Sequence, residues 1–153
     1  MKKIIAIALA LVLVLSFAAC SSESDEKTIK VGASPAPHAE ILEVAKEVLA
    51  ADGWTLEIVE FTDYVLPNET LTAGEIDANY FQHIPYLESF NKERGYHLFN
   101  AGGIHVEPFA LYSKSKKVKS IKDLKKKARI GIPNDPSNEG RALLLLQEAG
   151  LIK

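Results

Sequence analysis

Apolar and polar positions along the chain follow two periods, one of two residues and one of three to four, which predict strands and helices in alternation. Thr28–Ser34 is a short apolar run typical of a strand, and apolar residues recur at helical spacing over His38–Ala51. In Thr55–Phe61 apolar residues alternate with acidic ones, as in a half-buried strand. A strand, a helix and a strand in this order predict a parallel sheet with a right-handed crossover, and hence an α/β fold.

The pattern continues through the remainder of the chain, where glycines mark the ends of further elements. We predict a helix over Tyr64–Ala73, a strand over Ile76–Gln82 and a helix over Pro85–Arg94. Later expected elements are strands at Leu98–Ala101, Glu107–Ser113 and Arg129–Ile132, a helix that begins near Ser120 and a helix over Ser137–Ala149.

The beginning of the chain has the order of features of a secretory signal peptide. Two lysines are followed by twelve uninterrupted apolar residues, Ile4–Leu15, and then by a short segment that ends in Ala-Ala-Cys at Cys20. That run is shorter than the roughly 20 residues of a membrane-spanning helix. Cys20 is either an incidental thiol or, as its position favours, the lipidated cysteine of a bacterial lipoprotein. We therefore expect residues 1–19 to be removed, and residues 20–27 to be a lipidated cysteine and polar tether on the outer face of the cytoplasmic membrane or on a periplasm-facing membrane.

Composition and charge narrow the classes of partner. The 153 residues carry 18 basic and 20 acidic side chains, a formal charge of -2, which disfavours a nucleic-acid partner. Cys20 is the only cysteine, so the sequence offers neither an intrachain disulfide nor a multi-cysteine zinc site. Nine residues over 114–129 are basic and only Asp123 is acidic. We interpret this step in charge as a solvated surface and as the boundary between a first lobe, residues 28–113, and the start of a second, residues 114–153.

Common catalytic and cofactor motifs are missing from the sequence. It contains no phosphate-binding glycine loop, no dinucleotide-binding turn, no nucleophile elbow and no zincin helix. Together with export and a body of about one domain, this favours a binding protein over an enzyme. We expect no catalytic residues, no resident cofactor and no metal centre.

Three segments rich in polar and aromatic residues follow predicted strands, where open parallel sheets hold their ligands. They are residues 34–40, 79–86 and 134–141. In the second, period-two spacing points Phe81 and His83 to one side, and Tyr86 follows, which predicts either aromatic walls for an apolar group or ordinary core. In the third, a turn leads into a helix that carries Arg141 near its start, which predicts either a carboxylate site or a surface residue paired with a glutamate.

Four longer motifs in these and neighbouring segments resemble one known family. The motifs are GASPAPHAEIL at residues 32–42, DYVLPN at 63–68, DANYFQHIPYL at 77–87 and IPNDPSNEGRALLLL at 132–146. In this order they resemble the methionine-binding lipoproteins of bacterial methionine ABC importers, the NlpA lipoprotein family. Because members of that family are considerably longer, we expect this chain to correspond to little more than the first half.

The resemblance implies a two-lobed fold of the periplasmic-binding-protein type, with the first lobe largely present and the second lobe truncated. It also implies that the protein captures methionine, or a close analogue, and delivers it to an importer permease driven by a cytoplasmic ATPase. The implied ligand contacts are aromatic walls around the thioether and polar groups at the carboxylate: Tyr64, Phe81, His83 and Tyr86 for the first, and Asn138 and Arg141 for the second.

Other functions stay open on the sequence alone. A metal receptor of the zinc type would use His38, His83, His105 and Glu107 as ligands. A truncated surface lipoprotein would have no transport role, and an exported hydrolase would have catalytic residues dispersed along the chain. The sequence also does not choose between L-methionine, D-methionine, methionine sulfoxide and a small dipeptide.

Overall fold

The computed structural model describes residues 27–153 of the chain. The predicted signal peptide, the lipidation site at Cys20 and all of the tether except Lys27 lie outside the described residues. The chain divides into two compact units, the first ending at Phe81 and the second running from Gln82 to Lys153. The lobe boundary that the charge pattern suggests at residues 113 and 114 stays a prediction.

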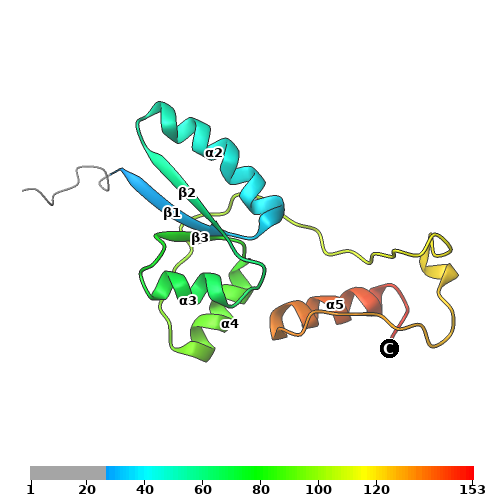
Figure 1. Ribbon diagram of the computed structural model, residues 1–153. Helices are drawn as coiled ribbons and strands as arrows, with labels where there is room; N and C mark the ends of the chain where they lie inside the picture. The colour runs from blue at the N-terminus through cyan, green and yellow to red at the C-terminus, as the bar shows by residue number, and fades with distance from the viewer. Residues whose placement is uncertain (1–26) are drawn as a thin grey trace, which may run out of the picture. The chain divides into compact units, whose positions relative to one another are not determined.

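A three-stranded parallel sheet organises the first unit (Figure 1). Its strands are β1 (Thr28–Ala33), β2 (Thr55–Glu60) and β3 (Ala78–Tyr80), and β1 lies between the other two. Val31 sits in the centre of the sheet, because its register partners are residue 58 of β2 and residue 78 of β3. The strand-helix-strand prediction for this part of the chain is therefore confirmed.

Helices connect the strands of the first unit. A π-helical turn, η1 (Pro35–Ala39), follows β1 and continues into α2 (Glu40–Ala51), which leads to β2. Helix α3 (Leu66–Thr72) leads from β2 to β3 (Figure 1). The buried core of the unit consists of apolar side chains from the strands and the segments beside them: Val31, Ala33, Ala39, Leu56, Ile76 and Phe81.

Two packed helices are the main elements of the second unit. They are α4 (Ile84–Arg94) and α5 (Pro136–Glu148), which contact each other. The buried side chains of the two helices are Tyr86, Leu87, Phe90, Ala142 and Leu146. Helix α4 ends at Gly95, whose φ of 68° is a left-handed conformation that glycine adopts without strain. Both helices confirm the sequence-based predictions.

The segment between α4 and α5 departs from the prediction. Among the described residues, the stretches 98–101, 107–113 and 129–132 do not form strands, and the helix expected near Ser120 is only a short 3-10 turn, η2 (Ile121–Asp123). A strand requires hydrogen bonds to a neighbouring strand, and no described segment pairs with these stretches. Within residues 27–153, no helix combines the length and the apolar character needed to span a membrane.

Candidate ligand-binding site

Two aromatic rings lie together at the end of the first unit. Tyr64 precedes α3 in a turn where the carboxylate of Asp63 accepts hydrogen bonds from the backbone N–H groups of Val65, at 2.8 Å, and Leu66, at 2.9 Å. Phe81 directly follows β3, and its ring centroid lies 6.0 Å from that of Tyr64. Phe81 is 8% exposed whereas Tyr64 is 54% exposed, so the pair combines a fixed ring with an accessible one.

A buried amide pair fixes the elements that carry these rings. Asn68, on α3, has no exposed surface, and its side-chain carbonyl accepts a hydrogen bond of 2.9 Å from the amide of Asn79 on β3. The same Asn79 amide donates to the backbone carbonyl of Pro67 at 3.1 Å. Because buried polar groups are costly unless they are paired, these bonds favour one packing of α3 on β3.

His83 begins α4 and has both ring nitrogens in hydrogen bonds. Its Nδ1 accepts the backbone N–H of Tyr86 at 3.0 Å, which caps the helix. A nitrogen that accepts carries no proton, so in neutral His83 the proton is on Nε2. This Nε2–H donates to the side-chain oxygen of Asn138 at 2.9 Å. Tyr86 is 9% exposed, and its ring centroid lies 6.4 Å from that of His83.

Asp135 caps the N-terminus of α5. Its carboxylate accepts hydrogen bonds from the backbone N–H of Asn138 at 2.9 Å and from the hydroxyl of Ser137 at 2.7 Å, and Pro136 occupies the first helical turn. Partial burial raises the pKa of Asp135, but the hydrogen bonds from Asn138 and Ser137 together outweigh it, and the net pKa lies below the ordinary value. The residue is therefore an anion at neutral pH.

Asn138 links this cap to Arg141. The Asn138 side-chain amide donates to both carboxylate oxygens of Asp135, at 3.1 and 3.0 Å. Its oxygen accepts from Nη1 of Arg141 at 3.0 Å, and the Arg141 guanidinium carbon lies 4.9 Å from the ring centroid of Phe109. An arginine side chain has five N–H donors, and over residues 27–153 this is the one hydrogen bond found for the guanidinium. Several donors consequently remain for an anion.

Comparison with known proteins places the chain in a family. The sequence profile of the NlpA lipoproteins matches residues 29–153. The chain belongs to the NlpA lipoprotein family. The chain is similar to the methionine-binding lipoprotein MetQ of Bacillus subtilis. The two sequences are 48% identical, and the match covers 99% of this chain and 57% of the MetQ sequence.

Solved structures of similar proteins support the same assignment. A nutrient-binding protein from Burkholderia cenocepacia bound to methionine is 49% identical, with a TM-score of 0.76 over 82% of this chain and 52% of that one. An ABC transporter periplasmic substrate-binding protein from Coxiella burnetii is 46% identical, with a TM-score of 0.75 over 82% of this chain and 53% of that one. The expected α/β class of the periplasmic-binding-protein type is therefore confirmed, and the NlpA-family chain spans about half the length of the relatives it matches.

The structure groups the predicted site residues of this NlpA-family chain within each unit. In the first, Tyr64 stands beside Phe81. In the second, His83, Asn138 and Arg141 form one hydrogen-bonded cluster, and the backbone N–H of Tyr86 donates to His83. Two further residues contact this cluster and were not predicted from the sequence: Asp135 and Phe109. The Asp-Pro-Ser sequence before a helix is a cap signal that identifies Asp135. No local pattern identifies Phe109, because its contact is with Arg141, 32 positions further along the chain, and Phe109 itself lies in an irregular segment.

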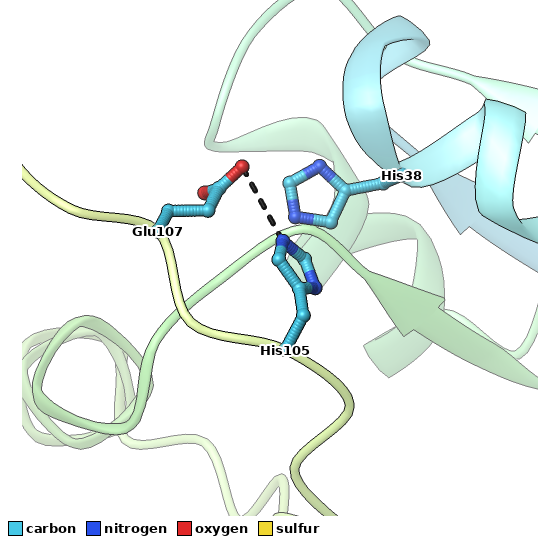
Figure 2. Close-up of side chains that lie close together, drawn as sticks. All are labelled: His38, His105 and Glu107. Carbon is cyan, nitrogen blue, oxygen red and sulfur yellow. Dashed lines mark ion pairs between the residues drawn. The ribbon is translucent and has the colours of Figure 1, made fainter.

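Two residues of the alternative metal site, His38 and His83, have hydrogen-bond partners outside that set, whereas His105 and Glu107 lie beside each other. In the first unit, Nδ1 of His38 shares a hydrogen bond of 2.6 Å with the hydroxyl of Ser34. In the second unit, both nitrogens of His83 are engaged, and Nε2 of His105 lies 3.4 Å from a carboxylate oxygen of Glu107 (Figure 2, dashed line). Zinc sites use three or four protein ligands, so the His105–Glu107 pair is not by itself such a site.

Proposed function

We propose that the protein is a substrate-binding lipoprotein that captures methionine outside the membrane and delivers it to an ABC importer. Its activity is reversible binding and not catalysis. The observation that carries the proposal is the Arg141 guanidinium, which is held by Asn138 and Phe109 and has most of its donors unbonded among the described residues. The names of the relatives, which include a methionine-binding lipoprotein and a structure with bound methionine, support the choice of ligand.

The carboxylate of the ligand is assigned to Arg141. A guanidinium presents parallel N–H donors that match the two oxygens of a carboxylate, which gives strong and directional hydrogen bonds. Asn138, bonded to Arg141 at 3.0 Å, stands beside this position. We assign both residues to the recognition of the amino-acid headgroup.

The thioether of the ligand is assigned to the aromatic residues. Sulfur attracts ring edges by about 0.3–1.5 kcal/mol per contact, and an unbranched thioether adapts to the shape between rings. Tyr64 and Phe81 in the first unit, and His83 and Tyr86 in the second, are the candidates. The ligand therefore has an anionic and an apolar end that different residues recognise.

Membership of a lipoprotein family supports a proposal for location and partners. We propose that Cys20 is lipidated after cleavage of residues 1–19, so that the protein stands on the outer side of a bacterial membrane and passes its ligand to a permease and its cytoplasmic ATPase. Cys20→Ser should move the protein from the membrane fraction to the soluble fraction, or leave an uncleaved precursor. An unchanged distribution and mass would contradict the lipid anchor.

Calorimetric titration of the full chain tests the ligand. We expect L-methionine to bind, and a titration with D-methionine under the same conditions compares the affinities of the two stereoisomers. Norleucine replaces the sulfur by a methylene, and methioninol removes the carboxylate, so both should bind more weakly if thioether and carboxylate are each recognised. Zinc chloride, with and without a chelator, tests the metal receptor. No heat with methionine together with stoichiometric zinc binding would replace the proposal by that alternative.

A further inference from the structure

The hydrogen bonds around Asn138 admit one assignment of protons. Arginine can only donate, so the Asn138 atom at 3.0 Å from Arg141 must be its oxygen. An ionised carboxylate can only accept, so the atom facing Asp135 must be the amide nitrogen. Two charged neighbours of opposite sign therefore orient the Asn138 amide, and the reverse orientation would lose both bonds.

This orientation has a consequence for Arg141. Asp135 contacts the Asn138 amide through both carboxylate oxygens, at 3.1 and 3.0 Å, and so fixes the direction of the Asn138 oxygen. That oxygen in turn holds one end of the guanidinium. Within the described residues, Asp135 forms no direct hydrogen bond with Arg141, so its effect on Arg141 passes through Asn138.

The ring of Phe109 restricts the guanidinium from a second direction. The guanidinium carbon lies 4.9 Å from the ring centroid, within the range in which a cation is attracted to an aromatic face. Both side chains are half-buried, so the attraction is less screened than on an open surface. In the part of the chain that the structure describes, one hydrogen bond and one ring contact define the position of the guanidinium, and most of its donors have no partner there.

We infer that Asp135 and Phe109 are positioning residues, which hold the Arg141 guanidinium in the orientation that binds the ligand carboxylate. The inference rests on the proposed function for the identity of the ligand, but the positioning itself is a property of the chain without ligand. A side chain that is already ordered loses less entropy on binding, so positioning raises affinity without adding a contact to the ligand.

Nitrogen-15 NMR of the arginine side chains measures the positioning directly. The chain has three arginines, Arg94, Arg129 and Arg141, and Arg141→Lys identifies the signals of the third. We expect slow guanidinium rotation and a ring-shifted resonance for Arg141, and an averaged signal for the exposed Arg129. Averaged Arg141 signals in the unmodified chain would overturn the inference, whatever the protein binds.

Variants separate positioning from a general role in folding. Asp135→Ser keeps a good helix cap but removes the two-oxygen contact to Asn138, so Arg141 should become averaged and methionine should bind roughly tenfold more weakly. Asp123→Ser is the matched control, because Asp123 accepts from the backbone of Lys119 and Ser120 in a turn of the same unit. It should change neither signal nor affinity.

The ring is tested by a pair of substitutions. Phe109→Tyr retains an aromatic face and should preserve the Arg141 signal and the affinity, whereas Phe109→Leu should remove the ring shift and weaken methionine binding several-fold. If Leu and Tyr behave alike, the ring has no positioning role. If methionine fails to bind the unmodified chain although Arg141 is ordered, the proposed function fails and the positioning stands.

Discussion

Substituting Gly32 by alanine tests the packing of the central strand. A β-carbon at this position would lie 2.7 Å from Cδ1 of Ile76 and 2.8 Å from Cε2 of Phe61. Carbon atoms in contact are about 3.5–4.0 Å apart, so the side chains of both Ile76 and Phe61 must move, or the strand itself must shift. Overpacking of this kind costs about 1–3 kcal/mol. The opposing gain from replacing glycine is only about 0.5–1 kcal/mol. The middle of the two ranges gives an expected net loss of stability on the order of 1 kcal/mol.

Gly140→Ala is the matched control, because it is the same chemical change but is expected to raise the stability of the protein. Gly140 lies inside α5, and a β-carbon there would meet no atom within 4 Å. Only the helix-propensity gain of about 0.5–1 kcal/mol remains, so this variant should be more stable.

The assay for both variants is urea unfolding. It is followed by the fluorescence of Trp54, the only tryptophan, which reports the first unit, and by far-UV circular dichroism. A Gly32→Ala protein as stable as the unmodified chain would refute the packing argument. If both substitutions destabilise the protein, the explanation by overpacking at residue 32 and by helix propensity at residue 140 would be refuted.

Three further predictions concern the site and its supports. Arg141→Lys should weaken methionine binding about 10- to 100-fold in calorimetry, because an ammonium cannot replace a two-pronged guanidinium contact; equal affinity would contradict the carboxylate assignment. Asn68→Ala should lower the free energy of unfolding by about 1–3 kcal/mol, because it removes a buried hydrogen-bond partner. Thr70→Ala on the same helix removes only a solvent-exposed hydrogen bond to the backbone carbonyl of Leu66 and should change that free energy by less than about 0.5 kcal/mol. Because the pKa of Asp135 is lowered in the folded state, its stabilisation is present above its ordinary pKa of about 3.9. That stabilisation should disappear as the pH falls through the lower folded value; acid unfolding unchanged in Asp135→Asn would contradict this.

Local patterns predicted the parts of the fold that local interactions determine. Helix α4 was predictable because its N-cap, its apolar spacing and a left-handed glycine all lie within the short segment from His83 to Gly95. β1 and β2 were predictable because both have strong apolar patterns and a helix between them. The stretches around residues 98–113 have strand-like composition, but strand formation depends on a partner elsewhere in the chain, and composition does not contain that information.

The candidate site shows the same division between local and distant information. Residue type and position near a helix start pointed to Arg141, whereas the family resemblance added Asn138. The bond of 3.0 Å between these two side chains spans only three residues. The bond from His83 to Asn138 spans 55 residues, and family resemblance, rather than spacing, assigned these two residues to one ligand. The role of Phe109 could not be predicted from the sequence. A single phenylalanine in an irregular segment has no sequence feature that shows whether its ring will contact a guanidinium, pack in the core or lie on the surface.

The position of β1 at the centre of the sheet affects the order in which the protein can assemble during synthesis. β1 is made first, yet one of its edges pairs with residues 55–60 and the other with residues 78–80. One edge must therefore remain open until about fifty further residues have been added, as the register of Val31 with Ala78 requires. An open parallel edge is a template for wrong pairing. A nascent chain halted between residues 61 and 77 should accordingly be more prone to aggregation than one that extends through Phe81, which a series of arrested chains would reveal.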